Sequence, residues 1–216
     1  IRKDFPTKFG LPRQSGITAN KSVIVFEKPF RSDDAIRGLE GYSHLWLIWE
    51  FSEARQQSAR LTVRPPRLGG NTRMGVFATR SPFRPNSLGL SCVRLIEVRR
   101  GTPDGTVLIV EGADILDGTP IYDIKPYLPF ADAHPDALGG FGENIKSDIT
   151  EIRFDCPVPD GLNGDKLETL RQILLEDPRP HYQNDSKRVY AFEFADRRIC
   201  FTVTGSTAVV TEITAN

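Results

Sequence analysis

Side chains that bind metals or form disulfide bonds are scarce in this sequence, which has three cysteines and three histidines among 216 residues. Cys92, Cys156 and Cys200 are far apart and form no Cys-X-X-Cys pair, which argues against a zinc knuckle and against a disulfide scaffold. Each lies in or beside an apolar run, so we expect buried free thiols in a reducing compartment. The scattered histidines argue against a histidine-rich metal site. We therefore expect no metal.

The signatures of several common enzyme classes are also missing. The sequence has no GxGxxG that opens a helix after a strand, no GxxxxGK[ST], no HExxH and no GxSxG. Hydride transfer on a dinucleotide fold, P-loop hydrolysis, zinc hydrolysis and serine hydrolysis therefore lose support. What remains is chemistry that depends more on positioning the reactants than on a reactive side chain.

Long apolar runs and excess charge of either sign are absent as well. No run reaches the length of a membrane span and no segment resembles a signal peptide, so we expect a cytoplasmic protein without a membrane partner. The formal net charge is zero, and the 39% hydrophobic and 26% charged residues are typical of a soluble globular protein. A polyanionic partner would have to bind a local basic patch.

Residues 63–90 provide such a patch. They contain four prolines, four glycines, no acidic residue and five arginines, namely Arg64, Arg67, Arg73, Arg80 and Arg84. Glycine lets the backbone approach a ligand, proline fixes loop geometry, and arginine offers planar donors for carboxylate and phosphate. The alternative is a solvated surface connection. Because the apolar run 74–79 reads as a strand that anchors the stretch, we favour a binding loop.

The remaining pattern predicts a mainly β protein. We expect strands at 22–26, 42–51, 88–98 and 106–111, with a hairpin turn at 103–105 and the strand 42–51 buried on both faces. Ser32 reads as the cap of a helix that ends at Gly38 or Gly41. Residues 129–146 read as a linker. Beyond it, a strand at 149–154, a helix at 166–175 and strands at 189–194, 198–204 and 208–213 predict a small βαβββ unit, with 177–182 as an exposed basic loop.

Two candidate site features stay ambiguous when they are considered alone. His44 stands at the head of an apolar strand, and a lone histidine is more often structural than a ligand. Asp114 and Asp117 flank a turn, where they could orient a ligand's hydroxyl or amine groups or simply stabilise the turn.

Four segments together resemble one family. They are Pro12-Arg-Gln14, His44-Leu45, the string from Gly75 to Asn86 with Gly89-Leu90, and the segment from Asp114 to Pro120. In this combination the chain resembles the TsaA-like, or YaeB, family of tRNA methyltransferases, and the string Thr79-Arg-Ser-Pro-Phe-Arg-Pro-Asn86 is highly specific to it. The tail around Asp177-Pro-Arg-Pro resembles the extra C-terminal domain of the bacterial members.

The resemblance implies an antiparallel β-barrel-like N-terminal domain at residues 1–140 and a small α+β C-terminal domain at 147–216 that contacts tRNA. It also implies a homodimer that binds S-adenosylmethionine and methylates N6 of threonylcarbamoyladenosine at position 37, beside the anticodon. Family members begin with a further short strand, which is absent or shortened here. The cofactor site carried over from the family comprises Pro12, Arg13, Gln14, His44, Leu45, Arg80, Leu90, Ile115, Leu116, Asp117 and Gly118.

Transfer to an amide-like nitrogen suggests a proton acceptor, because the lone pair of that nitrogen is delocalised. We expect Asp114 to take the proton, with Asn86 and Tyr122 as orienting groups, although all three residues could equally serve the fold or the cofactor. Phosphate contacts on the tRNA anticodon stem-loop are expected from Arg64, Arg67, Arg73, Arg84, Lys125, Arg179, Lys187 and Arg188.

Three other functions compete with this one. A non-enzymatic module that binds S-adenosylmethionine or RNA would share the binding residues but yield no methylated product. A methyltransferase of the same fold could act on a small metabolite, although the arginines favour a substrate that carries phosphate. A purely structural β-domain does not explain the arginines and glycines of residues 64–89.

Overall fold

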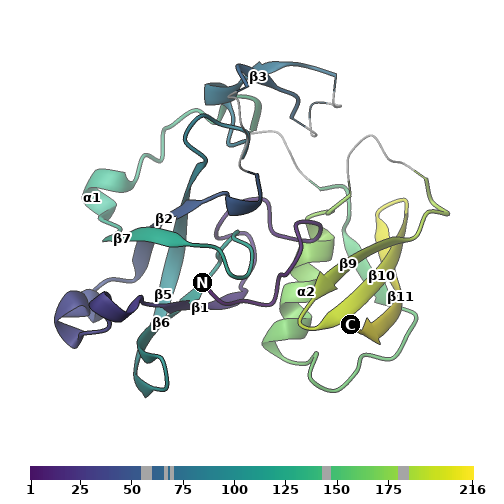
Figure 1. Cartoon of the computed structure of the whole chain (residues 1–216). Coiled ribbons are helices and arrows are strands. Elements are labelled where there is room, and N and C mark those ends of the chain that lie inside the picture. Colours follow the sequence, from purple (N-terminus) through teal and green to yellow (C-terminus); the bar gives the residue numbers. More distant parts are fainter. Residues whose placement is uncertain (55–59, 66–67, 69–70, 143–146, 180–184) are drawn as a thin grey trace.

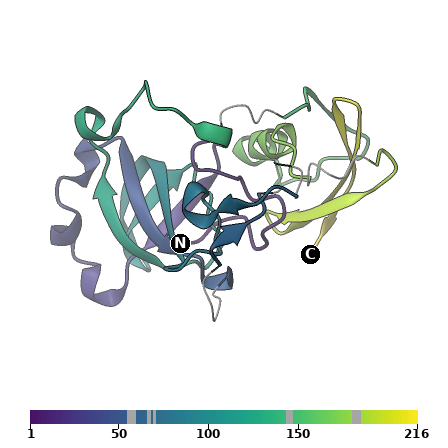
Figure 2. The same ribbon diagram turned by 90° about the horizontal axis from the view of Figure 1, so that it is seen from above.

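The structure is a computed structural model, and it describes residues 1–54, 60–65, 68, 71–142, 147–179 and 185–216. Two β-sheets form the two halves of the molecule, and the N-terminal segment runs between them (Figure 1). The same division is visible from above, where helix α2 (Asp165–Leu175) lies on the side of the second sheet that faces the first (Figure 2). No helix within the described ranges is long and apolar enough to cross a membrane.

The first sheet has the strand order β1-β6-β5-β2-β7, with every neighbouring pair antiparallel. Its strands are β1 (Lys21–Val25), β2 (His44–Glu50), β5 (Leu88–Thr102), β6 (Gly105–Glu111) and β7 (Ile121–Pro126). The mainly β prediction is confirmed, but β1 and β7 form two edges, so the strands do not make a closed barrel. Outside the edge strand β1, Arg2 makes an isolated antiparallel bridge to Val23.

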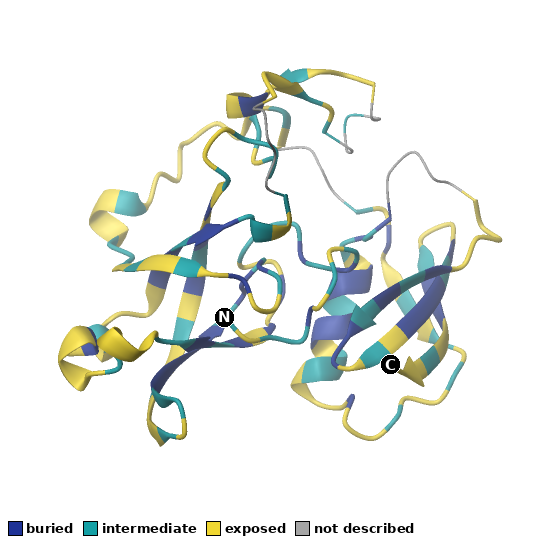
Figure 3. Cartoon of the chain, viewed as in Figure 1, coloured by how far each residue is buried: buried dark blue, intermediate teal, exposed yellow. Residues whose placement is uncertain are grey.

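The pleat of the sheet explains which positions are buried. In β2, Leu45, Leu47 and Trp49 point into the core, whereas Trp46 and Ile48 are only half-buried. The prediction that this strand is buried on both faces is therefore wrong. The predicted hairpin turn is confirmed, since β5 and β6 pair from Thr102 and Gly105 outward. Figure 3 shows the resulting alternation of buried and exposed positions.

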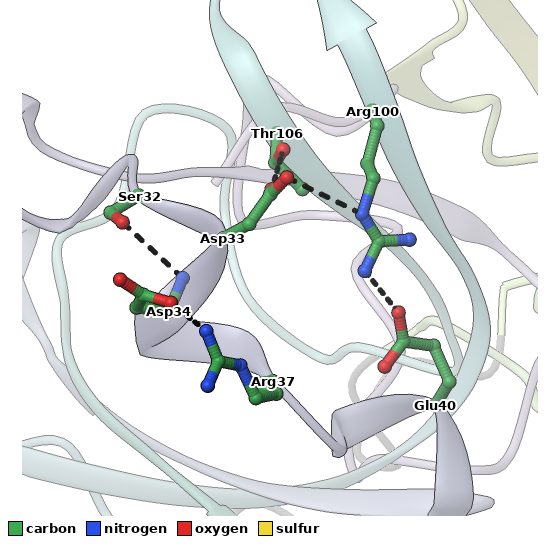
Figure 4. A network of polar contacts seen from close by, with 7 residues as sticks. All are labelled: Ser32, Asp33, Asp34, Arg37, Glu40, Arg100 and Thr106. Carbon is green, nitrogen blue, oxygen red and sulfur yellow. Dashed lines mark hydrogen bonds and ion pairs between the residues drawn. The ribbon is translucent and has the colours of Figure 1, made fainter.

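The predicted helix after Ser32 is two short 3-10 turns, Asp33–Ile36 and Leu39–Gly41. The cap itself is confirmed, because the Ser32 side chain accepts a hydrogen bond from the backbone N–H of Asp34. An exposed network joins these turns to the β5–β6 hairpin: Arg100 contacts Asp33 and Glu40, and Thr106 donates to Asp33 (Figure 4). Exposed ion pairs add little stability, so the network mainly fixes where the turns lie.

The predicted strand at 74–79 is largely wrong. Only β4 (Met74–Gly75) is extended, and it pairs with β3 (Thr62–Val63) before the chain enters a 3-10 turn at Val76–Ala78. Val76 is buried there while Phe77 is 78% exposed. The turn is closed by Thr79, whose hydroxyl donates to the carbonyl of Val76. Other short elements are α1 (Pro129–Asp132) and the 3-10 turns Lys28–Phe30, Ser52–Ala54 and Gly140–Gly142.

The second sheet has the order β8-β11-β10-β9, with β8 parallel to β11 and the other pairs antiparallel. Its strands are β8 (Glu151–Phe154), β9 (Tyr190–Phe194), β10 (Arg197–Thr204) and β11 (Thr207–Ala215). Together with α2 they confirm the predicted βαβββ unit. The turn between β9 and β10 is Ala195-Asp196, and both residues have positive φ, as a tight hairpin turn requires.

The N-terminal segment packs into the core of the second sheet. Phe5 is fully buried in that core, with its ring 5.0 Å from the ring of Phe194, and Phe9 packs edge-on against Phe192. Gly10 has positive φ, and a Cβ there would lie 2.4 Å from the Phe192 ring, so only glycine fits. The chain therefore contributes to the second core before it returns to the first sheet.

Candidate functional site

A cavity of about 1100 Å³ lies where the N-terminal loop, the first sheet and the end of α2 meet. The residues that line it come from six places along the chain: Lys8 to Gln14; Trp46 with Trp49 to Ala54; Arg64 with Thr79, Arg80, Pro82, Phe83 and Arg84; Leu88 to Leu90; Asp114, Leu116 and Thr119; and Pro178-Arg179. Concave sites with aromatic walls and a few convergent polar groups are typical of small-molecule binding.

Several of the residues expected from the sequence meet at this cavity. Of the expected cofactor residues, Pro12, Arg13, Gln14, Arg80, Leu90 and Leu116 line it, and so does the expected proton acceptor Asp114. Arg64, Arg84 and Arg179 from the expected RNA set line it too. Segments that are distant in sequence thus meet at this cavity.

Other expected residues lie elsewhere. His44 is exposed at the start of β2, where its ring contacts Ser43 and Tyr127. The side chains of Leu45 and Ile115 are fully buried in the core of the first sheet. These three side chains do not line the cavity that Arg13 lines, and their part in cofactor binding stays a prediction.

Asp117 and Gly118 are also outside this cavity. They border a separate, open groove together with Lys3 and Lys21. Asp117 accepts a hydrogen bond from the backbone N–H of Lys3, so it stabilises the loop. Asn86 is exposed and is not part of the cavity lining.

Asp114 is the carboxylate with the most distinctive surroundings. Its Oδ1 accepts a hydrogen bond from Ser91 Oγ at 2.5 Å, and Ser91 Oγ accepts one from Trp49 Nε1 at 2.9 Å. Burial raises the pKa of Asp114, although the Ser91 hydrogen bond and the positive charges of Lys3 and Arg80 oppose this rise. A carboxylate with a raised pKa is better suited to accept a proton near neutral pH.

Lys3 lies close enough to Asp114 for their charges to interact, and it is half-buried as well. Its Nζ donates to the carbonyl of Ala113 at 2.7 Å. Burial lowers the pKa of Lys3 to about 7, even though Asp114, Asp4 and Asp117 favour its charged form. No local pattern distinguishes this lysine from the others in the sequence.

The arginines that line the cavity differ in their hydrogen-bond partners. Arg13 Nη2 donates to the carbonyls of Asp177 and Arg179, which ties the N-terminal loop to the end of α2. Arg13 Nη1 is buried and has no hydrogen-bond partner among the described residues, so a ligand carboxylate could satisfy it. Arg80 donates to the side chain of Gln14.

The cavity also holds an acidic residue that the sequence analysis missed. Glu50 is only 7% exposed and accepts a hydrogen bond from the hydroxyl of Tyr122. The expected orienting residue Tyr122 is therefore linked to the cavity through Glu50, although it does not line the cavity itself. An acidic residue between Trp49 and Phe51, at the end of an apolar strand, was the available signal.

The expected phosphate contacts divide by exposure. Arg64, Arg73, Lys125, Lys187 and Arg188 are exposed, and Arg84 is half-buried and donates to the carbonyl of Thr79. Arg179 is buried and forms a two-point ion pair with Asp177, so the expectation of an exposed basic loop is wrong for these two residues. Arg67 and residues 180–182 lie outside the described residues. Among the described residues, no group of three or more His, Cys, Asp or Glu side chains is arranged to hold a metal ion.

Comparison with family models gives two matches that together cover most of the chain. The model of the tRNA-methyltransferase O N-terminal domain matches residues 1–133, and that of the TrmO C-terminal domain matches residues 158–216. The cavity residues up to Thr119 fall in the first match, and Pro178-Arg179 fall in the second.

Individual relatives agree with these matches. The chain is 41% identical to tRNA (adenine(37)-N6)-methyltransferase of Escherichia coli (strain K12), over 94% of this chain and 90% of that protein. It is 42% identical to a putative S-adenosylmethionine-dependent methyltransferase of Pseudomonas aeruginosa, over 85% of this chain and 80% of that protein. A solved structure described as the crystal structure of TrmO from P. aeruginosa aligns with a TM-score of 0.78 and 30% identity, over 100% of this chain and 93% of that one.

Proposed function

Because this chain belongs to the tRNA-methyltransferase O family, we propose that it uses S-adenosylmethionine to methylate N6 of the adenine at position 37 of tRNA. The observation that carries the proposal is the position of Asp114, a carboxylate whose pKa is raised by burial, on the wall of the large cavity. We further infer that the acceptor carries the threonylcarbamoyl group, because a carbamoylated N6 has the delocalised lone pair that makes a proton acceptor useful.

The cavity has the donor and acceptor set that S-adenosylmethionine requires. Aromatic walls from Trp46, Phe51 and Phe83 suit the adenine ring, and Arg13 Nη1 offers a hydrogen-bond donor to the carboxylate of the methionine part. The carboxylate of Glu50 suits the ribose hydroxyls. When bound, S-adenosylmethionine supplies a methyl group on a sulfonium that is already activated for transfer.

The chain itself must position the acceptor and take up a proton. We expect the proton to leave N6 for a carboxylate oxygen of Asp114, so that the electron pair of the N–H bond forms the new N–CH3 bond. The electron pair of the broken C–S bond would stay on sulfur, which would leave as a neutral thioether. Holding the two reactants in line can account for about 7–11 kcal/mol of the barrier, so no covalent intermediate with the protein is needed.

The tRNA is expected to lie across the exposed basic residues near the cavity mouth and on the second sheet. Arg64 and Arg73 come from the β3–β4 region, and Lys187 and Arg188 precede β9. Such contacts bind phosphate without reading the sequence, so they position the anticodon stem-loop. A tRNA substrate also implies action in the cytoplasm. The homodimer remains a prediction, for which the molar mass from light scattering is the test.

Incubation of the protein with S-adenosylmethionine and bulk tRNA, followed by nucleoside mass spectrometry, tests the function directly. We expect one added methyl group on the modified adenosine. Asp114→Asn should lower turnover by about 10²–10⁴-fold, the range for lost general base catalysis, with S-adenosylmethionine affinity nearly unchanged. Asp136→Asn, at an exposed position, is the matched control. Binding without any methylated product would favour the non-enzymatic module, and unchanged turnover of Asp114→Asn would refute Asp114 as the proton acceptor.

A further inference from the structure

Two buried side chains, Trp49 and Ser91, and the half-buried Asp114 form a series of hydrogen bonds with a fixed direction. Trp49 Nε1 donates to Ser91 Oγ at 2.9 Å, and Ser91 Oγ donates to Asp114 Oδ1 at 2.5 Å. An indole N–H can only donate, so the serine oxygen must act as its acceptor. The single hydroxyl proton of Ser91 is then directed at Asp114. The direction of these hydrogen bonds thus follows from the chemistry of the tryptophan.

The fold keeps the hydrogen bonds between Trp49, Ser91 and Asp114 away from water and leaves space for the indole. Ser91 is 0% exposed and Trp49 is 6% exposed, so solvent does not compete for these hydrogen bonds. Trp49 is opposite Gly89 in the pairing of β2 with β5. A Cβ on Gly89 would lie 2.2 Å from Trp49 Cε2, so glycine is required for the indole to cross β5 and reach Ser91.

We propose that Ser91 and Trp49 are positioning residues for methyl transfer, which fix the carboxylate of Asp114 so that Oδ1 is occupied and Oδ2 accepts the proton from N6. The proposal rests on the proposed role of Asp114. It goes beyond that role because it assigns a function to two residues that do not act on the substrate directly. Ser91 also favours the charged form of Asp114, the form able to accept a proton.

Other charged groups face Asp114 from neighbouring elements and must stay constant in any test. Lys3 comes from the N-terminal segment and Arg80 from the loop before β5, and both favour the charged form of Asp114. Glu50 and Glu53 line the same cavity from β2 and the turn after it. Substitutions at Ser91 and Trp49 remove no charge, so these four groups remain in place.

The dependence of kcat on pH, measured with S-adenosylmethionine and tRNA, tests the proposal. In Ser91→Ala the carboxylate loses a hydrogen bond that favours its charged form, so the acidic limb of kcat moves to higher pH. Turnover on the plateau falls about tenfold to a hundredfold, the equivalent of one hydrogen bond to a charged group. KM for S-adenosylmethionine stays within about twofold, because Ser91 acts through Asp114. Ser91→Thr keeps the hydroxyl and restores the wild-type profile.

Trp49→Phe gives the second arm. It keeps an aromatic ring but removes the N–H, so the serine proton is no longer directed at Asp114. The acidic limb of kcat therefore also moves to higher pH, by less than in Ser91→Ala. In the double variant with Ser91→Ala, the loss of Trp49 N–H adds nothing further to the shift. Ser32→Ala, which removes an exposed cap remote from the cavity, is the control and keeps the wild-type profile.

The outcomes distinguish the positioning role of Ser91 and Trp49 from the role of Asp114 as proton acceptor. If Asp114→Asn is inactive while Ser91→Ala shows the wild-type pH profile and turnover, the positioning role is overturned and the role of Asp114 stands. If Asp114→Asn retains turnover, both fail. Should Ser91→Ala not fold, Ser91→Cys keeps the side-chain size with only a weak donor and gives the same shift. Full additivity of the shifts in the double variant also overturns the proposal.

Discussion

Breaking the ion pair between Asp177 and Arg179 should cost far more stability than breaking a similar pair on the surface. The two side chains are 11% and 9% exposed, and Arg179 Nε and Nη2 donate to the two carboxylate oxygens at 2.8 and 2.9 Å. Removing one partner of a buried pair leaves an uncompensated charge, which costs about 3–5 kcal/mol. We expect the loss of stability in Asp177→Asn to lie near the lower end of this range, because the amide keeps one acceptor oxygen.

Asparagine is the right replacement because Asp177 has a positive φ of 47°, a conformation that asparagine tolerates better than alanine. Arg153 and Asp155 provide the control. They have the same two-residue spacing and two-point contact, at 2.8 and 3.1 Å, but their side chains are 60% and 48% exposed. Asp155→Asn should cost about 0–1 kcal/mol, as is usual for surface pairs.

Urea unfolding followed by circular dichroism measures the difference. A loss of about 3 kcal/mol would be a large fraction of the about 5–15 kcal/mol typical of a domain, so the midpoint shift should be plain. Adding Arg179→Met to Asp177→Asn removes the unpaired charge and should recover part of the loss. If Asp177→Asn costs no more than Asp155→Asn, the argument from burial is wrong.

Three further predictions concern the cavity and its surroundings. Gly89→Ala forces a Cβ against the buried indole of Trp49 and should cost about 1–3 kcal/mol of stability along with turnover, whereas Gly41→Ala, with open space around it, should change neither. Burial lowers the pKa of Lys3 from 10.5 to about 7, so between these pH values the unfolded chain binds one proton more than the folded chain. The free energy of unfolding of the wild type should therefore rise from pH 7 to pH 10 relative to that of Lys3→Met. Denaturation curves at both pH values check this. Arg73→Ala should weaken tRNA binding and reduce the slope of log K against log salt by about 0.7–0.9 in filter binding, while an unchanged slope would remove Arg73 from the interface.

The regular elements could be predicted from the sequence because their signals are local. Alternating apolar residues located the strands, and the turn residues Pro103 to Gly105 located the β5–β6 hairpin. The cap at Ser32 was equally local, but the length of the helix was not. The first turn ends at Ile36, and Gly38, which has positive φ, precedes the second turn. The strand predicted at 74–79 failed because the turn at Val76–Ala78 depends on burial of a single side chain, which periodicity does not report.

The site was predictable only in part, for a different reason. Arg13, Arg80 and Asp114 belong to short, distinctive segments, so a family resemblance could name them. Trp49 and Ser91 stand in ordinary strands, and their role depends on the register of β2 against β5. Register is a property of pairing between distant segments, so no local pattern reveals that an indole and a hydroxyl meet behind Asp114.

The position of the cavity follows from the path of the N-terminal segment. Phe5 and Phe9 are fixed in the second core, and Arg13, four residues beyond Phe9, donates to two carbonyls at the end of α2. The same loop holds Gln14 next to Arg80 from the first half. A tRNA bound to the basic residues of the second half therefore rests on a unit that also supports the cavity wall. Because buried contacts join the N-terminal segment to the second sheet, a displacement of that sheet would move Arg13 relative to Asp114. If the second half binds tRNA as proposed, placement of the tRNA and the position of Arg13 in the cavity wall are therefore linked.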